Sequence, residues 1–451
     1  MPDPSPSPSL GGSTTELKRT IGPITLIFFG VGSMLGAGIY ALVGTAAGQL
    51  GNAVWLGFAV AMVAALLTGL SYASIGSRYP RAGGAAYATQ RAFGINMLSY
   101  VVGLSVVASG LTSMAAGSRA IGAELVKMGS PLQPGLMAII YLCLLSLIVF
   151  RGIRESMWMN IVCTTIEFLG LMFVIVVGFK FWGSVNLLQG PPLASGDGFE
   201  ALTVSIVMSG AVLTFFSFIG FEDILNVSEE TKNPETTIPI GLIGAMLIAS
   251  VVYMAVAITA VSVGLPNDQL VNQGLRGVVA KAAPWFSPNL FSVITIFAVA
   301  NTALLNYVMG SRLVYGMARQ SLLPKVLGKV HAKRQTPHVA VFVLLVLVIA
   351  LMLTGKLAEL GAVTVLLLLS VFTVVNIALL VVKHRPGEPR GRFEVPSFVP
   401  ILGALTCTSL LFFRVVYPPA SAPNAAYIAL AILVIASILY LVIRPRSVEV
   451  A

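Results

Sequence analysis

The sequence predicts an all-α polytopic membrane protein, and two features of its composition point to this fold class. Hydrophobic residues make up 57% of the 451 residues, and charged residues only 10%, against about 25% in an ordinary soluble domain. So little charge cannot cover a body of this size with polar surface, which excludes a soluble globular enzyme as well as a disordered chain. The apolar residues also occur in long runs, unlike the short alternating segments of a transmembrane barrel.

Twelve apolar runs are each long enough for a transmembrane helix, which needs about 20 mostly apolar residues. Because the count is even, both chain termini are expected on the same side of the membrane. The runs cover residues 21–48, 51–77, 95–124, 134–150, 156–181, 200–228, 238–263, 288–318, 338–354, 357–382, 396–415 and 424–443.

The distribution of Lys and Arg predicts which side is cytoplasmic. With the N-terminus in the cytoplasm, 20 of the 27 basic residues fall on the inner side and seven on the outer side. Because cytoplasmic loops are enriched in basic residues, we expect a multi-pass protein of the cell membrane with both termini in the cytoplasm. The net charge of +10 is then explained by topology and not by nucleic-acid binding. The basic run from Lys325 to Arg334 is expected to contact lipid headgroups.

The chain is predicted to contain three parts. These are a Pro/Ser-rich disordered cytoplasmic tail (1–20), a ten-helix core (21–395), and two further helices with a short cytoplasmic C-terminal tail (396–451). No cleavable signal peptide is visible, and the longest connections are too short for a soluble domain. The three cysteines lie in apolar runs and the three histidines in polar connections, so we predict neither a disulfide framework nor a metal site.

Two of the runs carry a glycine-rich interruption. The first has four glycines from Gly30 to Gly38, each costing a helix about 1 kcal/mol relative to alanine. The sixth places Gly220 beside Glu222 and Asp223 within apolar sequence. Close packing of small residues would explain the first interruption, and a helix that ends at Gly220 would explain the second. Paired interruptions in two halves of a chain are also the best sequence pointer to a transporter binding site.

The chemistry of such interruptions favours a zwitterionic ligand. An unwound segment at membrane depth leaves backbone N–H and C=O groups without partners, which is tolerated where they line a cavity or meet a ligand. The N–H groups at a half-helix N-terminus suit a carboxylate, and free carbonyl groups suit an ammonium group. We therefore expect an α-amino acid as the substrate class.

Four stretches of the sequence resemble one family of transporters. Residues 32–40 (GSMLGAGIY) resemble the first-helix motif of the amino acid–polyamine–organocation (APC) transporters, and residues 215–239 look like their sixth helix and the loop after it. Residues 315–340 are similar to their loop between helices eight and nine, and residues 78–87 match their loop after helix two. The resemblance extends over about residues 20–445 and looks most like bacterial relatives of the cationic amino acid transporter branch.

This resemblance implies a LeuT-type fold, in which spans 1–5 and 6–10 form inverted repeats with helices 1 and 6 broken, and spans 11 and 12 are appended. It implies alternating access around a central site. Backbone N–H groups of residues 36–38 would bind the substrate carboxylate, and carbonyl groups of residues 34, 216 and 219 would bind the ammonium group under an aromatic lid. The residues implied are Met34, Gly36, Ala37, Gly38, Phe216, Ile219 and Gly220.

Further residues are candidates for gating or proton coupling. Glu167 lies in the middle of an apolar run, where an ionisable residue is a functional hypothesis by default; the alternative is a protonated side chain bonded to a neighbouring helix. Some proton-coupled relatives carry Lys in this region, where this chain has Thr165. Glu222 is expected either as a gate or proton-linked residue or as a helix-start carboxylate. Asp223 is expected to face the inner water or to pair with Lys232 and Arg residues of the loop.

Two polar residues of the eighth run, Asn301 and Thr302, complete the candidate set. They are expected either to line the site, where they could help to hold Na⁺, or to form interhelical hydrogen bonds. The coupling ion is expected to be H⁺, with Na⁺ as the alternative, and no other cofactor is predicted.

These observations favour a secondary transporter that moves neutral α-amino acids, because helices 3, 8 and 10 offer no central buried acid for a cationic side chain. An amino acid/amine exchanger or a polyamine transporter is the alternative within this class. A channel, which would need a continuous polar pore or rings of charge, is the alternative from another class. An enzyme is not expected, and ATP-driven transport is excluded because no Walker motif is present. The expected partners are the amino acid and membrane lipids.

Overall fold

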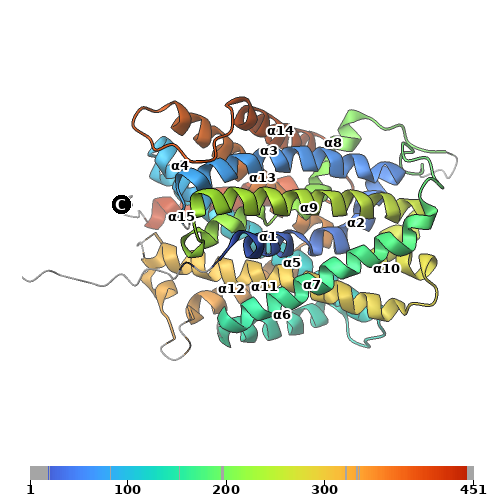
Figure 1. Ribbon diagram of the computed structural model, residues 1–451. Coiled ribbons are helices and arrows are strands. Elements are labelled where there is room, and N and C mark those ends of the chain that lie inside the picture. The colour runs from blue at the N-terminus through green and yellow to red at the C-terminus, as the bar shows by residue number, and fades with distance from the viewer. Residues whose placement is uncertain are drawn as a thin grey trace, which may run out of the picture.

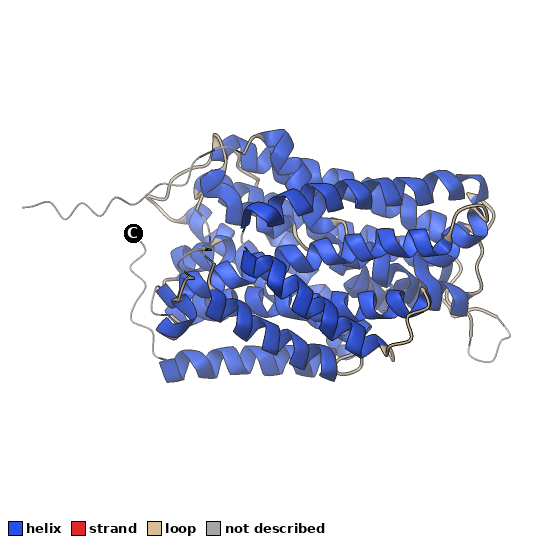
Figure 2. Ribbon diagram, turned by 90° about the horizontal axis from the view of Figure 1, so that it is seen from below, coloured by secondary structure: helices blue, strands red, loops and turns tan. Residues whose placement is uncertain are grey.

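A computed structural model describes residues 19, 21–81, 83–151, 153–193, 198–319, 322–331, 334 and 336–443. Helices form the regular structure of these residues, apart from the isolated bridges Ile21–Thr231 and Pro192–Phe199 (Figure 2). The predicted tails at 1–20 and 444–451 lie outside the described residues, Arg19 excepted. The all-α prediction is confirmed.

Long helices lie side by side across the molecule (Figure 1). Among the described residues, ten helical segments are long and apolar enough to cross a membrane, and α1 and α12 are apolar but shorter. This confirms a polytopic membrane protein; the twelve-span inverted-repeat layout stays a prediction. The helices are α1 (Pro23–Met34), α2 (Ala37–Leu50), α3 (Val54–Arg78), α4 (Gly84–Phe93), α5 (Asn96–Lys127), α6 (Pro134–Arg151), α7 (Ile153–Gly178), α8 (Val204–Phe215), α9 (Pro234–Ser262), α10 (Asn267–Ala282), α11 (Pro288–Arg319), α12 (His338–Thr354), α13 (Leu357–His384), α14 (Phe398–Val416) and α15 (Ala425–Ile443).

Two helices lie in stretches that the sequence led us to expect as connections. The helix α4 follows α3 and turns small residues such as Ala85, Ala88 and Ala92 toward the protein. The helix α10 lies between α9 and α11 and bends at Gly274, whose φ is 55°. Both are too polar to be found as apolar runs, and tertiary packing of one face stabilises them. They mark opposite ends of the molecule (Figure 1). We call the α4 end the inner end, because the basic residues predict that it faces the cytoplasm, and the α10 end the outer end.

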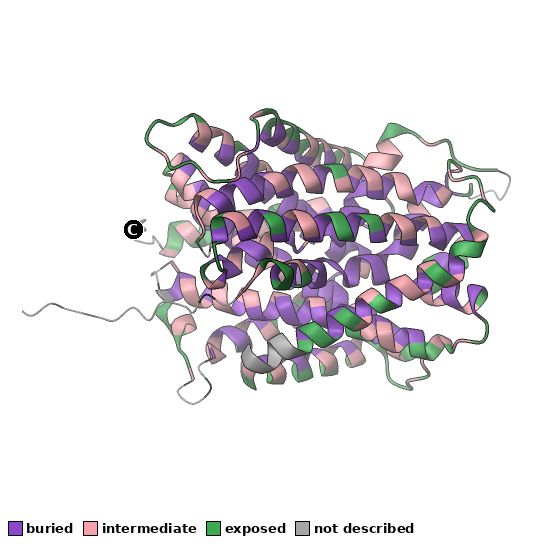
Figure 3. Cartoon of the chain, viewed as in Figure 1, coloured by how far each residue is buried: buried purple, intermediate pink, exposed green. Residues whose placement is uncertain are grey.

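The helices differ in how much of their surface the protein covers (Figure 3). In its most apolar stretch α13 is 67% buried, whereas α15 is 11% buried. The first therefore packs inside the bundle and the second keeps an apolar surface that suits lipid. The exposed large side chains of α15 include Leu430, Val434 and Ile438.

At the inner end, residues 385–395 fold back over α3, α4 and α13 and are held by two glutamates. Glu394 accepts a hydrogen bond from Arg78 (2.8 Å) and forms an ion pair with Lys383 (3.6 Å). Glu388 accepts hydrogen bonds from the Tyr79 hydroxyl (2.6 Å) and from Arg91 (3.0 Å). Burial would raise the pKa of each carboxyl, but these hydrogen bonds outweigh it and hold both pKa values below the usual range.

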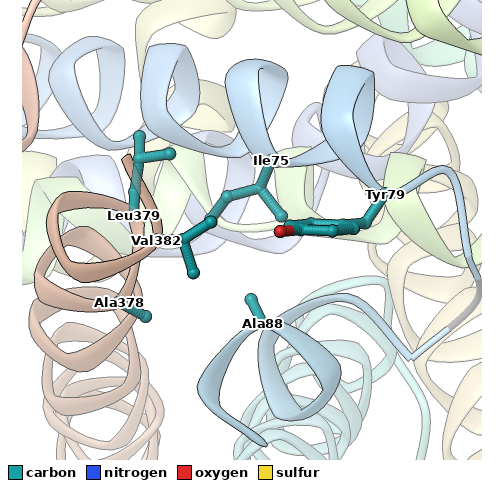
Figure 4. Close-up of a pocket in the computed structure, with 6 residues that line it drawn as sticks. All are labelled: Ile75, Tyr79, Ala88, Ala378, Leu379 and Val382. Atoms are coloured by element: carbon teal, nitrogen blue, oxygen red, sulfur yellow. The ribbon is translucent and has the colours of Figure 1, made fainter. Parts of the chain in front are cut away.

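An apolar contact lies beneath these ion pairs (Figure 4). The side chains of Ile75 from α3 and of Tyr79, the residue that follows α3, meet Ala88 from α4. Ala378 and Val382 from α13 complete the group with Leu379. The contact leaves no room for a water-sized molecule, so its contribution is packing, and Tyr79 joins it to the Glu388 cluster.

Replacing Glu394 by glutamine is expected to destabilise the protein at neutral pH by about 1–3 kcal/mol, because the change leaves the buried Arg78 guanidinium without its charged acceptor. The folded-state pKa of Glu394 is lowered, so its contribution is present above the unfolded-state pKa of about 4.3. The contribution is lost as the pH falls through the folded-state value. The difference in Tm between the wild type and Glu394→Gln should therefore disappear in strong acid. Equal Tm values at neutral pH would contradict this, and Glu200→Gln, an exposed acid at the outer end, is the control.

Candidate functional site

The first glycine-rich run is broken where the sequence predicts. The helix α1 ends at Met34, Leu35 is extended, and Gly36 takes a φ of 153° before α2 begins at Ala37. A Cβ on Gly36 would lie 2.0 Å from the Thr302 hydroxyl oxygen of α11, so any side chain at this position would displace Thr302. The Ala37 N–H donates to the same hydroxyl (3.4 Å). Thr302 therefore lies at the N-terminus of α2, where the first N–H groups lack helical partners.

The second break divides the sixth run. After α8 comes the short 3-10 helix η3 (Phe216–Phe218), then Ile219 in an extended conformation and Gly220 with a φ of 117°. The following half is also a 3-10 helix, η4 (Phe221–Glu230). Runs of this geometry longer than three or four residues are uncommon and often mark a hinge. Glu222 accepts the Gly220 N–H at 2.9 Å, which corresponds to the helix-start role expected for it.

The two breaks touch each other. A Cβ on Gly220 would lie 2.5 Å from the carbonyl oxygen of Ser33, the residue before the end of α1. A Cβ on Gly38 would lie 2.4 Å from the Cα of Ser217 in η3. The glycines therefore allow close backbone contact between the two interrupted segments.

Asp223 contacts the first break as well as its own segment. Its carboxylate accepts a hydrogen bond from the Ser33 hydroxyl (3.0 Å) and one from the Asn226 amide (3.3 Å). It is only partly exposed. Asp223 thus keeps part of the exposure that we expected, and the folding of η4 against α1 also brings it to the first break.

Tyr253 of α9 is a site residue that the sequence analysis missed. Its fully buried hydroxyl lies 2.6 Å from the Met34 carbonyl oxygen and 2.8 Å from the Ser217 carbonyl oxygen, to which it donates. It thus connects the two breaks directly. The available signal was a tyrosine inside an apolar run, because a buried phenol needs a hydrogen-bond partner.

Replacing Tyr253 by phenylalanine is expected to weaken both stability and uptake. Phenylalanine lacks the hydroxyl that donates to two buried carbonyl groups, and losing this donor costs about 1–3 kcal/mol of stability. Because these carbonyls lie at the breaks, the KM for uptake should rise by roughly tenfold. Labelled uptake and the Tm measure the two effects. Tyr427→Phe, an exposed tyrosine of α15, is the control, and unchanged KM and Tm would refute the role.

A polar cluster borders the first break on the α7 side. The Thr164 hydroxyl donates to the Asn160 side chain (3.3 Å) and accepts from the Asn301 amide of α11 (3.3 Å). A Cβ on Gly32 would lie 2.1 Å from that hydroxyl. Asn301 therefore forms the interhelical hydrogen bond that was one of its two expected roles, and its role in lining the site stays a prediction.

Thr165 does not lie in this cluster. It is exposed and donates to the Ile161 carbonyl of its own helix (2.9 Å). Adjacent residues of a helix point about 100° apart, so a shift of one position decides which threonine faces the break. The structure assigns that place to Thr164 and corrects the candidate Thr165.

Glu167 lies on the same side of α7 as Thr164, and its side chain is fully buried. Neither of its carboxyl oxygens has a hydrogen bond to a described residue. The Asn301 side chain lies near the carboxyl, but no hydrogen bond of good geometry joins them. The main-chain carbonyl of Glu167 accepts the Tyr40 hydroxyl of α2 at 2.6 Å. The predicted intramembrane acid thus lies in the interior, attached to the broken helix.

The remaining predicted residues collect at the meeting point of the breaks. Phe216 is buried, and its ring faces Gly361 of α13. Its carbonyl accepts the Ile219 N–H at 3.3 Å. No group of three or more His, Cys, Asp or Glu residues suited to a metal occurs in the described part of the chain. What these residues do toward a substrate stays a prediction.

The chain matches a family model and is similar to known transporters, three of which are described here. Residues 21–439 match the model described as amino acid permease. The chain is 30% identical to cationic amino acid transporter 9, chloroplastic, of Arabidopsis thaliana, over 73% of this chain and 61% of that relative's length. It is 28% identical to the branched-chain amino acid permease BcaP of Bacillus subtilis over 88% of each chain. It is 29% identical to the methylthioribose transporter of the same organism over 91% of each chain.

The family model extends over the broken helices and the polar cluster, from before α1 into α15. The resemblance based on the four sequence stretches is therefore confirmed. The chain belongs to the amino acid permease family of the APC superfamily, whose relatives above are transporters and permeases, not enzymes.

Proposed function

We propose that this protein is a secondary transporter that moves neutral α-amino acids across the cell membrane by alternating access, coupled to protons. The contact between two interrupted helices is the observation that carries this proposal. At membrane depth, backbone groups without helical partners are tolerated only where they line a cavity or are buried in protein. Family membership supports amino acids as the transported class.

The two breaks offer complementary chemistry for a zwitterion. The N-terminus of α2 supplies N–H groups and a positive dipole end for a carboxylate. The carbonyl groups of Met34 and Ser217 point to a common hydroxyl and retain a second lone pair each, which suits an ammonium group. Thr302 would give up its bond to the Ala37 N–H when the carboxylate binds.

Alternating access would use the two halves of each broken helix. On the outer side, α10 packs on α2 so closely that a Cβ on Gly44 would lie 2.3 Å from the Leu270 carbonyl oxygen. On the inner side, the Ser33 hydroxyl bonds to Asp223 of η4. Opening to one side would separate α10 from α2, and opening to the other would separate α1 from η4.

The buried acids favour a neutral substrate. Glu124 is engaged by Lys127 (2.7 Å) and by the Ser292 hydroxyl (2.8 Å). Glu359 accepts the Asn424 N–H (3.2 Å). Both acids are therefore held at the outer end and do not offer a free carboxylate to a cationic side chain. The name of the branched-chain permease relative agrees with this preference, whereas the name of the cationic amino acid transporter relative points to a cationic substrate.

We assign proton coupling to Glu167 because of its position in the interior. A carboxyl inside a membrane protein without an ion-pair partner in the described residues is a natural place for a proton to bind and leave. The Tyr40 hydroxyl links its main chain to α2, which would let protonation act on the broken helix. Na⁺ at the polar cluster, amino acid/amine exchange and polyamine transport are the alternatives to be tested.

A thermal-shift screen of the twenty amino acids tests the assignment. A ligand that binds only the folded state at 100 times its Kd adds about 2.7 kcal/mol, so neutral α-amino acids should raise the Tm. Decarboxylated amines of the same side chains should fail, because they cannot use the N-terminus of α2. If no amino acid raises the Tm, the proposal is wrong, whereas a response to Arg or Lys alone would overturn only the neutral preference. Methylthioribose and Na⁺ are further probes.

A further inference from the structure

A cavity of about 510 Å³ lies at the inner end, away from the two breaks. It is enclosed by the end of α6, the inner part of α11 and the segment that precedes α12, and none of its lining residues belongs to α1, α2, α8 or η4. Along α11, ten residues separate Thr302 at the break from Arg312 in this cavity, a rise of about 15 Å. The lining residues are Val149, Val308, Ser311, Arg312, Tyr315, Val330, Thr336 and Pro337.

Arg312 is the charged residue of this lining. Within the described residues its guanidinium has no hydrogen bond or ion pair, and Glu230 of η4 acts on its charge only at longer range. The side chain is half-buried. A guanidinium carries five N–H donors and does not lose its charge in proteins, so one on a cavity wall without a protein acceptor is available to an anionic ligand.

Of the other polar groups at the cavity, one holds two segments of its wall together and two add hydrogen-bonding atoms near it. The Thr336 hydroxyl donates to the Phe150 carbonyl (3.1 Å), which joins the segment before α12 to α6. His331 and His338 follow the lining residues at 330 and 337, and their rings lie 6.1 Å apart, edge to face. The Nδ1 atom of each is buried and has no hydrogen-bond partner among the residues that the structure describes. Two imidazoles beside the cavity therefore have unused hydrogen-bonding capacity.

The surroundings of the cavity are basic. Lys325 and Lys329 are exposed in the segment before α12, and Arg151 is exposed at the end of α6. Arg334 lies over the Phe150 ring at 5.1 Å. These basic side chains outnumber Glu230, the acid that acts on Arg312, and an excess of one sign of charge attracts the opposite ion.

We propose that this cavity binds a phosphate group, with Arg312 as its principal ligand. A guanidinium matches phosphate oxygens through paired hydrogen bonds, Glu230 acts on it only at longer range, and the volume is in the range of small-ligand sites. The phosphate can belong to an anionic lipid of the inner leaflet or to a soluble phosphate compound of the cytoplasm. The proposal does not depend on the amino acid site, because the two share no residue.

The test measures the Tm of the full-length protein in phosphatidylcholine nanodiscs. One arm adds inorganic phosphate or pyrophosphate, and the other adds phosphatidylglycerol to the nanodisc. The effective arm identifies the source of the phosphate. For Arg312→Gln the concentration needed for half the Tm shift should rise about ten- to a hundredfold, the loss expected for a charge-assisted hydrogen bond. Lys325→Gln removes a charge nearby but outside the lining, and should change this concentration much less than Arg312→Gln does.

Two further measurements keep the result decisive. Arg312→Lys keeps the charge but loses the paired hydrogen-bond geometry, so it should bind phosphate with intermediate affinity. It replaces Arg312→Gln in the test if that variant folds poorly. The Tm shift caused by a neutral amino acid reports that each variant is folded. The proposal is overturned if neither probe stabilises the wild type, or if Arg312→Gln responds as the wild type does.

Discussion

Replacing Gly220 by alanine is expected to abolish amino acid uptake while the protein still reaches the membrane. A Cβ at this position would lie 2.5 Å from the Ser33 carbonyl oxygen and 2.7 Å from its carbonyl carbon. Both are main-chain atoms, so no side chain can rotate away, and the two breaks must move apart. The φ of 117° would also be strained for alanine. Since even 1.4 kcal/mol corresponds to a factor of ten, uptake should fall by more than about tenfold.

Gly129→Ala separates steric overlap from backbone strain. Gly129 also has a positive φ, of 99°, but a Cβ there would meet nothing within 4 Å. This variant should lose some stability and keep its uptake. Labelled uptake into liposomes, normalised to the amount of reconstituted protein, is the measurement. Full uptake by Gly220→Ala would show that the contact between the breaks is not needed for transport.

Replacing Glu167 by glutamine is expected to remove the dependence of uptake on pH. Glutamine keeps the size of the side chain and its capacity to interact with Asn301, but it cannot bind or release a proton. The wild type should take up substrate faster when the outside is acidified, and the variant should show one slow rate at acidic and neutral pH. Replacing Na⁺ by choline should change neither protein.

The control for Glu167 is a buried acid with partners. Glu124→Gln removes the acceptor of Lys127 and Ser292 at the outer end, so it should lower the Tm and keep the pH dependence. Unchanged pH dependence in Glu167→Gln would end the assignment of this residue to proton coupling. The substrate-binding proposal would survive that result, because it rests on the breaks.

Much of the fold could be predicted from residue type along the chain. Apolar runs long enough to span a bilayer occur where helices are found, because a membrane requires every backbone group of a span to be bonded within a helix. The break at Gly36 was predictable for a related reason, since clustered glycines disfavour a helix. The break at Gly220 was marked by the acids that follow it in apolar sequence.

The helices α4 and α10 were missed, because their sequences are too polar to stand out and neighbouring helices stabilise them. The sequence also could not predict which of Thr164 and Thr165 faces the first break. Both are polar and adjacent, and only the rotation of α7 against α1 decides which one faces the break. The contact between Asp223 and Ser33 also depends on tertiary structure, since the packing of η4 against α1 sets the position of Asp223.

The sequence by itself determined the fold class, the places where two helices break and the burial of Glu167, because these follow from the hydrophobicity and backbone preferences of consecutive residues. Only the tertiary structure decided that the two breaks touch, that Tyr253 joins them through the Met34 and Ser217 carbonyls, and that Thr302 meets Gly36. These contacts join residues far apart in the chain, and the angle and depth at which helices pack place them. No local pattern contains that information.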